Sequence, residues 1–151
     1  MSNLAELNRR WSVPDYPPTP VSAEEIAEAE RNLSFSFPAA YRDAVLATGL
    51  PRLTTELWED IEAAGLDLSH LCDFLTPQET VSTTRDYKDA GMPANVVGFA
   101  SDSGGNLFVF RSDTADDAVW MFDHDFLTVK PVAPSFEAWL KAYGDLPQRA
   151  A

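Results

Sequence analysis

The apolar residues of this chain gather most densely in three short runs between Asn95 and Val129. The first two runs share residues 95–110 and are separated by Gly, Asp and Ser, and the third occupies residues 118–129. Short runs rich in Val, Phe and Trp between turn residues predict consecutive strands. In the second and third runs both alternating faces are apolar. This pattern is typical of strands in the middle of a sheet that has a layer packed on each face.

Helical patterns lie on both sides of these strands. The clearest start signals are two capping boxes, formed by Ser22 with Glu25 and by Thr76 with Glu79, in which side chain and backbone N–H groups bond reciprocally. Apolar residues at three- and four-residue spacing extend each helix. We expect helices over residues 2–11, 22–33, 38–49, 55–64, 76–87 and 135–144.

The remaining segments complete the organisation of the chain. Residues 128–132 predict a fourth strand, whereas residues 66–75 are apolar without a clear period and are assigned to no element. Helices first, strands next and a helix last predict an α+β fold, with an antiparallel β-meander sheet packed with helices. We expect an N-terminal helix and Pro-rich arm over 1–20, a single domain over 21–144 and a tail over 145–151.

The composition and net charge of the chain limit the classes of partner that we expect. The 151 residues are 45% apolar, and 11 basic against 24 acidic residues give a net charge of −13. A chain with this much negative charge repels phosphate backbones and anionic membranes. We therefore expect no nucleic-acid and no membrane partner. It would attract a basic partner; the alternative is that the charge serves solubility alone. The absence of a signal peptide or membrane-spanning run predicts a cytoplasmic location.

Residues 101–105 read Ser-Asp-Ser-Gly-Gly, which resembles the surroundings of the nucleophile in trypsin-like proteases. A serine nucleophile needs a base that is oriented by an acid, and His70 and His124 are the histidines available. The structural alternative is a hairpin turn in which the glycine pair supplies positive φ. We favour the turn over a nucleophilic Ser103.

The sequence Asp123-His124-Asp125 raises the question of a metal site. A calcium loop needs oxygen ligands at fixed alternating offsets around a central glycine, and this frame is missing here. A zinc site draws on more Cys or His than the single Cys72 and two histidines provide nearby. We therefore expect no metal and no cofactor, and we interpret the stretch as a solvated acidic loop.

Four stretches, taken together and in order, suggest a known family. The first is an opening helix pair, Ile26–Leu33 followed by Phe37-Pro38-x-x-Tyr41-x-x-x-Val45-Leu46, and the second is a glycine-rich turn, Phe99–Phe108. The third is a strand that ends in an aromatic residue, Asp, His and an acidic residue, Val119–Asp125, and the fourth is a closing helix, Ser135–Leu140. This arrangement resembles the SUKH superfamily, of the SMI/KNR type, over roughly residues 21–144. The chain departs from the family in the middle, where Thr48-Gly49-Leu50-Pro51 replaces an Asn-Gly-Gly type turn.

The resemblance implies a non-enzymatic binding domain. Family members of this kind bind and neutralise a cognate toxin, often a nuclease or other enzyme delivered between competing cells. The acidic charge agrees with a basic toxin as the partner. Two alternatives stay open: a scaffold or regulatory module with an endogenous partner, and a small hydrolase that uses Ser103.

We expect the partner to bind acidic loops at the ends of the meander, where carboxylates face a groove that normally holds phosphate. The candidate residues are Asp102, Asp113, Asp116, Asp117, Asp123 and Asp125. A second acidic cluster competes with them and consists of Glu56, Glu59, Asp60 and Glu62.

Overall fold

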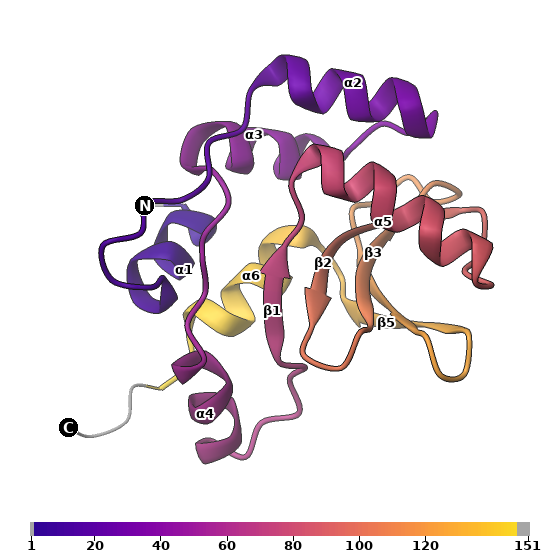
Figure 1. The fold of residues 1–151 in the computed structure, drawn as a ribbon. Coiled ribbons are helices and arrows are strands. Elements are labelled where there is room, and N and C mark those ends of the chain that lie inside the picture. The colour runs from indigo at the N-terminus through magenta and orange to yellow at the C-terminus, as the bar shows by residue number, and fades with distance from the viewer. Residues whose placement is uncertain (1, 148–151) are drawn as a thin grey trace.

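The computed structural model describes residues 2–147, which form one sheet with helices on both faces (Figure 1). The helices are α1 (Asn3–Trp11), α2 (Ala23–Leu33), α3 (Ala39–Thr48), α4 (Glu56–Ala63), α5 (Pro77–Asp89) and α6 (Phe136–Gly144). The strands are β1 (Leu71–Phe74), β2 (Val96–Asp102), β3 (Leu107–Arg111), β4 (Val119–Asp123) and β5 (Thr128–Ala133). The predicted α+β fold with an antiparallel meander is confirmed. Among residues 2–147, no helix combines the length and apolar character needed to cross a membrane.

The strands pair in the order of the chain, and every pairing is antiparallel. Strands β2 to β5 lie where the sequence predicts them, but β1 lies within residues 66–75, to which the pattern assigned no element. Leu71 and Phe74 are both buried although they are three residues apart. The reason is that the pairing with β2 shifts at Cys72 and inserts one extra residue. This bulge removes the two-residue spacing by which a strand is predicted.

Strand β3 is buried on both faces, as its apolar pattern predicts, whereas β4, predicted to be buried in the same way, buries Val119 and Phe122 but leaves Trp120 and Met121 partly exposed. All of residues 107–110 in β3 are buried. On one face Phe108 and Phe110 pack with residues of α1, α3 and α6, and on the other Leu107 and Val109 pack in a smaller cluster beside α5. The sheet is therefore the middle layer of three (Figure 1).

Aromatic rings join the helices to the sheet. Phe99 and Phe110 stack across neighbouring strands with centroids 4.2 Å apart. Tyr41 of α3 meets both rings edge-on at 5.8 and 5.7 Å, and Trp139 of α6 lies 5.3 Å from Phe99. Edge-to-face and stacked pairs at these distances add to the free energy of burial, so these rings fix α3 and α6 against β2 and β3.

The N-terminal helix forms as predicted and packs on α6. Its apolar residues Leu4, Leu7 and Trp11 are buried, and the Trp11 indole N–H donates to the carbonyl oxygen of Tyr143 (3.1 Å). Arg10 donates to carbonyl oxygens at the end of α6 and in the segment that follows it. Of the predicted tail over 145–151, residues 148–151 lie outside the described part of the chain.

Both predicted capping boxes are present. Ser22 Oγ accepts a hydrogen bond from the Glu25 N–H (3.1 Å), and Glu25 Oε1 accepts one from the Ser22 N–H (3.0 Å). Thr76 and Glu79 repeat both bonds at the start of α5. These bonds give partners to N–H groups that the first turn of a helix leaves unpaired. Helices α2 and α5 consequently begin where the sequence predicts.

A bulge in β2 is tied to α5 by one buried hydrogen bond. The pairing of β2 with β3 shifts between Gly98 and Ala100, which makes Phe99 the extra residue. The Gly98 N–H donates to Thr84 Oγ1 (3.1 Å), and Thr84 is fully buried. The Thr84 hydroxyl thus provides the acceptor for a backbone donor that water does not reach.

We expect Thr84→Val to lower the free energy of unfolding by about 1–3 kcal/mol, because it leaves the Gly98 N–H buried without its acceptor. Thr84→Ser keeps the hydroxyl and loses one buried methyl, so it should cost about 1 kcal/mol or less. Urea unfolding curves with an unchanged slope measure both values. A valine variant no less stable than the serine variant would show that this bond contributes little.

Candidate functional site

The structure divides the candidate aspartates between the two ends of the sheet. In an antiparallel meander, successive turns lie at alternate ends of the strands. The β2–β3 and β4–β5 turns therefore share one end, while the β3–β4 loop lies at the other (Figure 1). The first end holds Asp102, Asp123 and Asp125, and the second holds Asp113, Asp116 and Asp117.

We call residues 102–106 and 123–127 together the acidic end of the sheet. Its two turns are joined by one side chain, since Asn106 Oδ1 accepts from the His124 N–H (3.1 Å) and lies 2.7 Å from His124 Nδ1. The Tyr87 hydroxyl of α5 donates to a carbonyl oxygen of the first turn (2.7 Å). The two turns and the last part of α5 therefore hold one another in place.

Asp102 shapes the β2–β3 turn. Its carboxylate accepts hydrogen bonds from the Gly104 N–H, the Asn106 N–H and the Asn106 side chain, at 2.8, 2.9 and 3.1 Å. Gly105 takes positive φ (+87°), whereas Gly104 does not, so the prediction for the glycine pair is right for one member. Burial raises the pKa of Tyr87, and the charge of Asp102 raises it further.

The β4–β5 turn contains one carboxylate that shapes it and one that faces solvent. Asp123 Oδ1 accepts from the Asp125 N–H (2.9 Å) and from the Phe126 N–H (3.3 Å). The Asp125 side chain is 73% exposed, and its Oδ1 lies 3.5 Å from His124 Nε2. Asp125 is therefore the carboxylate of this turn that is available to a partner.

The same turn presents two apolar side chains that the sequence analysis missed. Phe126 is 77% exposed and Leu127 is 49% exposed. Leu127 has φ +55°, and it lies over Gly91, where a β-carbon would come within 3.0 Å of Leu127 Cδ1. The available signal was an aromatic residue directly after the Asp-His-Asp turn, which the sequence analysis read as part of an apolar run.

The aspartates at the opposite end bond to neighbouring groups. Arg111 donates two hydrogen bonds to the Asp113 carboxylate (2.9 and 2.6 Å), and this contact lowers the pKa of Asp113 to about 2. Asp116 accepts from a backbone N–H two residues later (3.3 Å), and Asp117 accepts from the Phe136 N–H at the start of α6 (3.4 Å). An open hollow of about 600 Å³ lies beside this loop.

The competing acidic cluster on α4 is only partly at the surface. Asp60 is 6% exposed because it lies on the inward face of the helix, with Leu57 and Ile61. The Asp60 carboxyl group is therefore not presented at the surface. The exposed members of the cluster are Glu56, Glu59 and Glu62.

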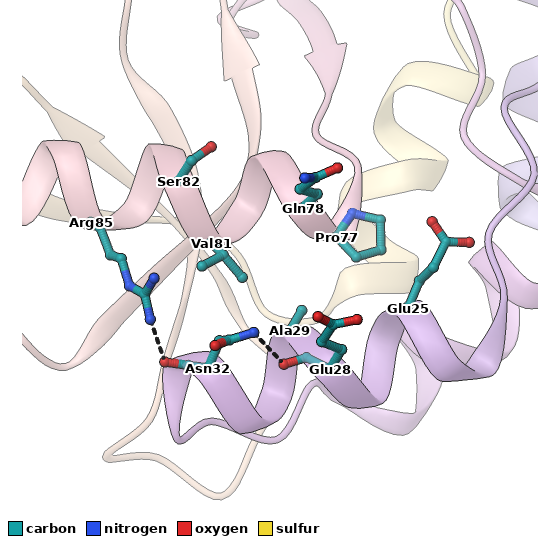
Figure 2. A pocket seen from close by; sticks show the side chains of 9 residues that line it. All are labelled: Glu25, Glu28, Ala29, Asn32, Pro77, Gln78, Val81, Ser82 and Arg85. Atoms are coloured by element: carbon teal, nitrogen blue, oxygen red, sulfur yellow. Dashed lines mark hydrogen bonds between the residues drawn. The ribbon is translucent and has the colours of Figure 1, made fainter.

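A groove of about 390 Å³ lies between α2 and α5, and Figure 2 shows its lining side chains. Ala29 and Val81 give it an apolar floor, and Glu28 lies on the α2 side. At one end the Arg85 guanidinium donates to the Asn32 carbonyl oxygen (3.1 Å) and joins the two helices. Sequence reasoning missed this groove, because it forms between helices that are distant in the chain.

The hydrolase alternative needs Ser103 beside a histidine base. Ser103 is exposed in the β2–β3 turn, and its backbone N–H donates to the His70 carbonyl oxygen (3.1 Å). The His70 ring stacks on Trp58 with centroids 5.8 Å apart. The His124 ring bonds to Asn106. Each imidazole thus has a partner that is not the Ser103 hydroxyl.

The Asp123-His124-Asp125 triplet brings three ligand-type atoms within 4.8 Å of one another. Hard cations prefer several free carboxylate and carbonyl oxygens. Here Asp123 Oδ1 already accepts two backbone hydrogen bonds. The arrangement therefore serves the turn, and we assign it no metal.

Comparison with known proteins finds a matching family and a solved structure of similar fold. The sequence matches the SMI1 / KNR4 family (SUKH-1) over residues 20–142. A crystal structure of a protein from Pseudomonas syringae pv. tomato is similar over 92% of this chain and 93% of that chain, with a TM-score of 0.61 and 14% identity. At that identity the likeness shows the fold alone. No curated protein matches the chain.

We expect Asp102→Ala to lower the free energy of unfolding by about 1–3 kcal/mol, because three donors of the β2–β3 turn lose a charged acceptor. Asp125→Ala should change it by less than about 0.5 kcal/mol, since Asp125 is an exposed residue without such a role. Urea unfolding of the two variants makes the comparison. Equal effects would contradict the division between carboxylates that shape the turns and carboxylates that face solvent.

The Asp113 carboxyl should titrate near pH 2 in the folded protein, because Arg111 stabilises its ionised form. A depressed folded-state pKa contributes stability above the unfolded value, and this contribution is lost as the pH falls toward 2. In Arg111→Met the Asp113 pKa should return toward the usual value of about 3.9. Carboxyl chemical shifts followed during an acid titration measure it. An unchanged pKa in the variant would contradict the assigned cause.

Proposed function

The chain belongs to the SMI1/KNR4 family (SUKH-1), and on that premise we propose that it is a non-enzymatic immunity protein that binds and neutralises a basic protein toxin. Proteins with SUKH domains are commonly immunity proteins. The net charge of −13 supports a basic partner. A nuclease fits this description, because its active-site groove is built to hold phosphate groups.

The observation that carries the proposal is the construction of the acidic end. Two turns from different hairpins are locked together through Asn106 and His124, and the end of α5 holds them from the side. Carboxylates of Asp102 and Asp123 fix the backbone, and Asp125 extends into solvent. A preformed acidic surface binds without first losing conformational freedom, which favours affinity.

The proposed mechanism is occlusion. Negative charge on the chain steers a basic toxin toward the acidic end and raises the association rate. Carboxylates then occupy positions that substrate phosphates take in the free toxin. The toxin stays folded but its groove is filled, so no covalent chemistry by this chain is required. Asp113, Asp116 and Asp117 lie at the opposite end and contribute to the long-range field.

The second candidate function is a scaffold or regulatory module with an endogenous partner. The groove between α2 and α5 favours it, because this surface has an apolar floor and its lining includes no residue of the acidic end. The two functions differ in the surface that is used. Substitutions in the groove, such as Ser82→Trp, would then disrupt binding, while substitutions at the acidic end would not.

The purified chain should form a complex with the product of a toxin gene encoded beside it, and the complex should abolish toxin activity. The association rate should fall as salt rises, because exposed charges are screened. Asp125→Asn should slow association at low salt, whereas Asp43→Asn, which removes the same charge from an exposed position on α3, should change it little. Stopped-flow mixing measures these rates. A complex that leaves the toxin active would contradict the proposal.

A further inference from the structure

We infer that Phe126 is the central anchor of the partner interface, and that it enters an apolar socket rimmed by lysine or arginine side chains on a basic protein. This inference rests on the proposed function and specifies the partner's surface. The β4–β5 turn that carries Phe126 extends from the sheet at the lower right of Figure 1.

The exposure of Phe126 has no structural explanation within the described chain. Of the nine phenylalanines, Phe126 is 77% exposed and the other eight are buried. The other exposed large apolar side chains are 39–55% exposed. An aromatic ring in water loses the favourable free energy that burial provides. Aromatic side chains are typical of the few residues that contribute most of the binding free energy at protein interfaces.

The backbone beneath Phe126 is fixed before any partner arrives. The Phe126 N–H donates to Asp123 Oδ1, and the preceding His124 is bonded to the neighbouring turn. Leu127 follows with φ +55°, a conformation that few residues other than glycine adopt, and its side chain is packed over Gly91. A side chain on a preformed turn binds with less loss of entropy than one on a mobile loop.

The charges around the ring select the partner. Asp123 and Asp125 precede Phe126 within three residues, and Asp102 lies at the start of the adjoining turn. Carboxylates so close repel phosphate, which argues against insertion into an anionic bilayer or stacking on a nucleic-acid base. They also repel a second copy of this chain, whose net charge is −13. A basic protein with an apolar pocket is the partner that satisfies both the ring and the carboxylates.

The surface chemistry is tested with a probe that imitates the socket, an amino-substituted β-cyclodextrin whose apolar cavity is ringed by ammonium groups. NMR titration should show shifts centred on residues 123–127 and tighter binding than by neutral β-cyclodextrin. Phe126→Ala should abolish those shifts, and Asp125→Asn should reduce the preference for the cationic host. Equal affinity for the two hosts, or shifts centred elsewhere, would overturn the inference.

Kinetics with the product of the adjacent toxin gene test the anchor itself. Phe126→Ala should speed dissociation at least about tenfold and leave the salt dependence of association unchanged. Leu46→Ala is the matched control, because Leu46 is 43% exposed on α3, and it should change neither rate. A Phe126→Ala complex that dissociates at the wild-type rate contradicts this inference alone. A wild-type chain that forms no complex contradicts the proposed function and this inference with it.

Discussion

The burial of β2 and β3 on both faces is the constraint from which the rest of the structure follows. A strand that is apolar on both sides needs a covering layer on each, so α1, α3 and α6 pack on one face and α5 packs beside the other. Stacked and edge-on rings around Phe99 and Phe110 hold the thicker layer in place. Since both faces of the central strands are covered, the parts of the sheet that remain at the surface include the turns at its ends and the edge strand β5.

Most of the architecture was predictable because its signals are local. Each capping box is formed by residues three positions apart, and the two-sided apolar pattern of β3 lies within four residues. Strand β1 was not predictable in this way, since a bulge at Cys72 breaks the alternation. Phe126 was missed for a related reason: a four-residue turn sits inside an apolar run, and only the pairing of Asp123 with Thr128 reveals it.

The candidate site shows what an acidic sequence leaves undetermined. Six aspartates were predicted to bind a partner, but sequence spacing does not show which carboxylates bond to the chain's own backbone. Asp102 and Asp123 shape turns, Asp113 pairs with Arg111, and Asp125 faces solvent. At the acidic end, the carboxylate presented to solvent is thus that of Asp125, directly before the exposed Phe126 in the chain. In the proposed complex, charge would speed the encounter with a basic partner, and the fit of the two surfaces would set the dissociation rate.

The central claim is that a rigid sheet end, and no other surface, meets the partner. Backbone amide shifts of the isotope-labelled chain, recorded with and without the product of the adjacent toxin gene, test it most directly. The account predicts that the largest changes fall on residues 102–106 and 123–127, with little change along α2. Changes concentrated in the groove between α2 and α5, or on the exposed face of α4, would contradict it.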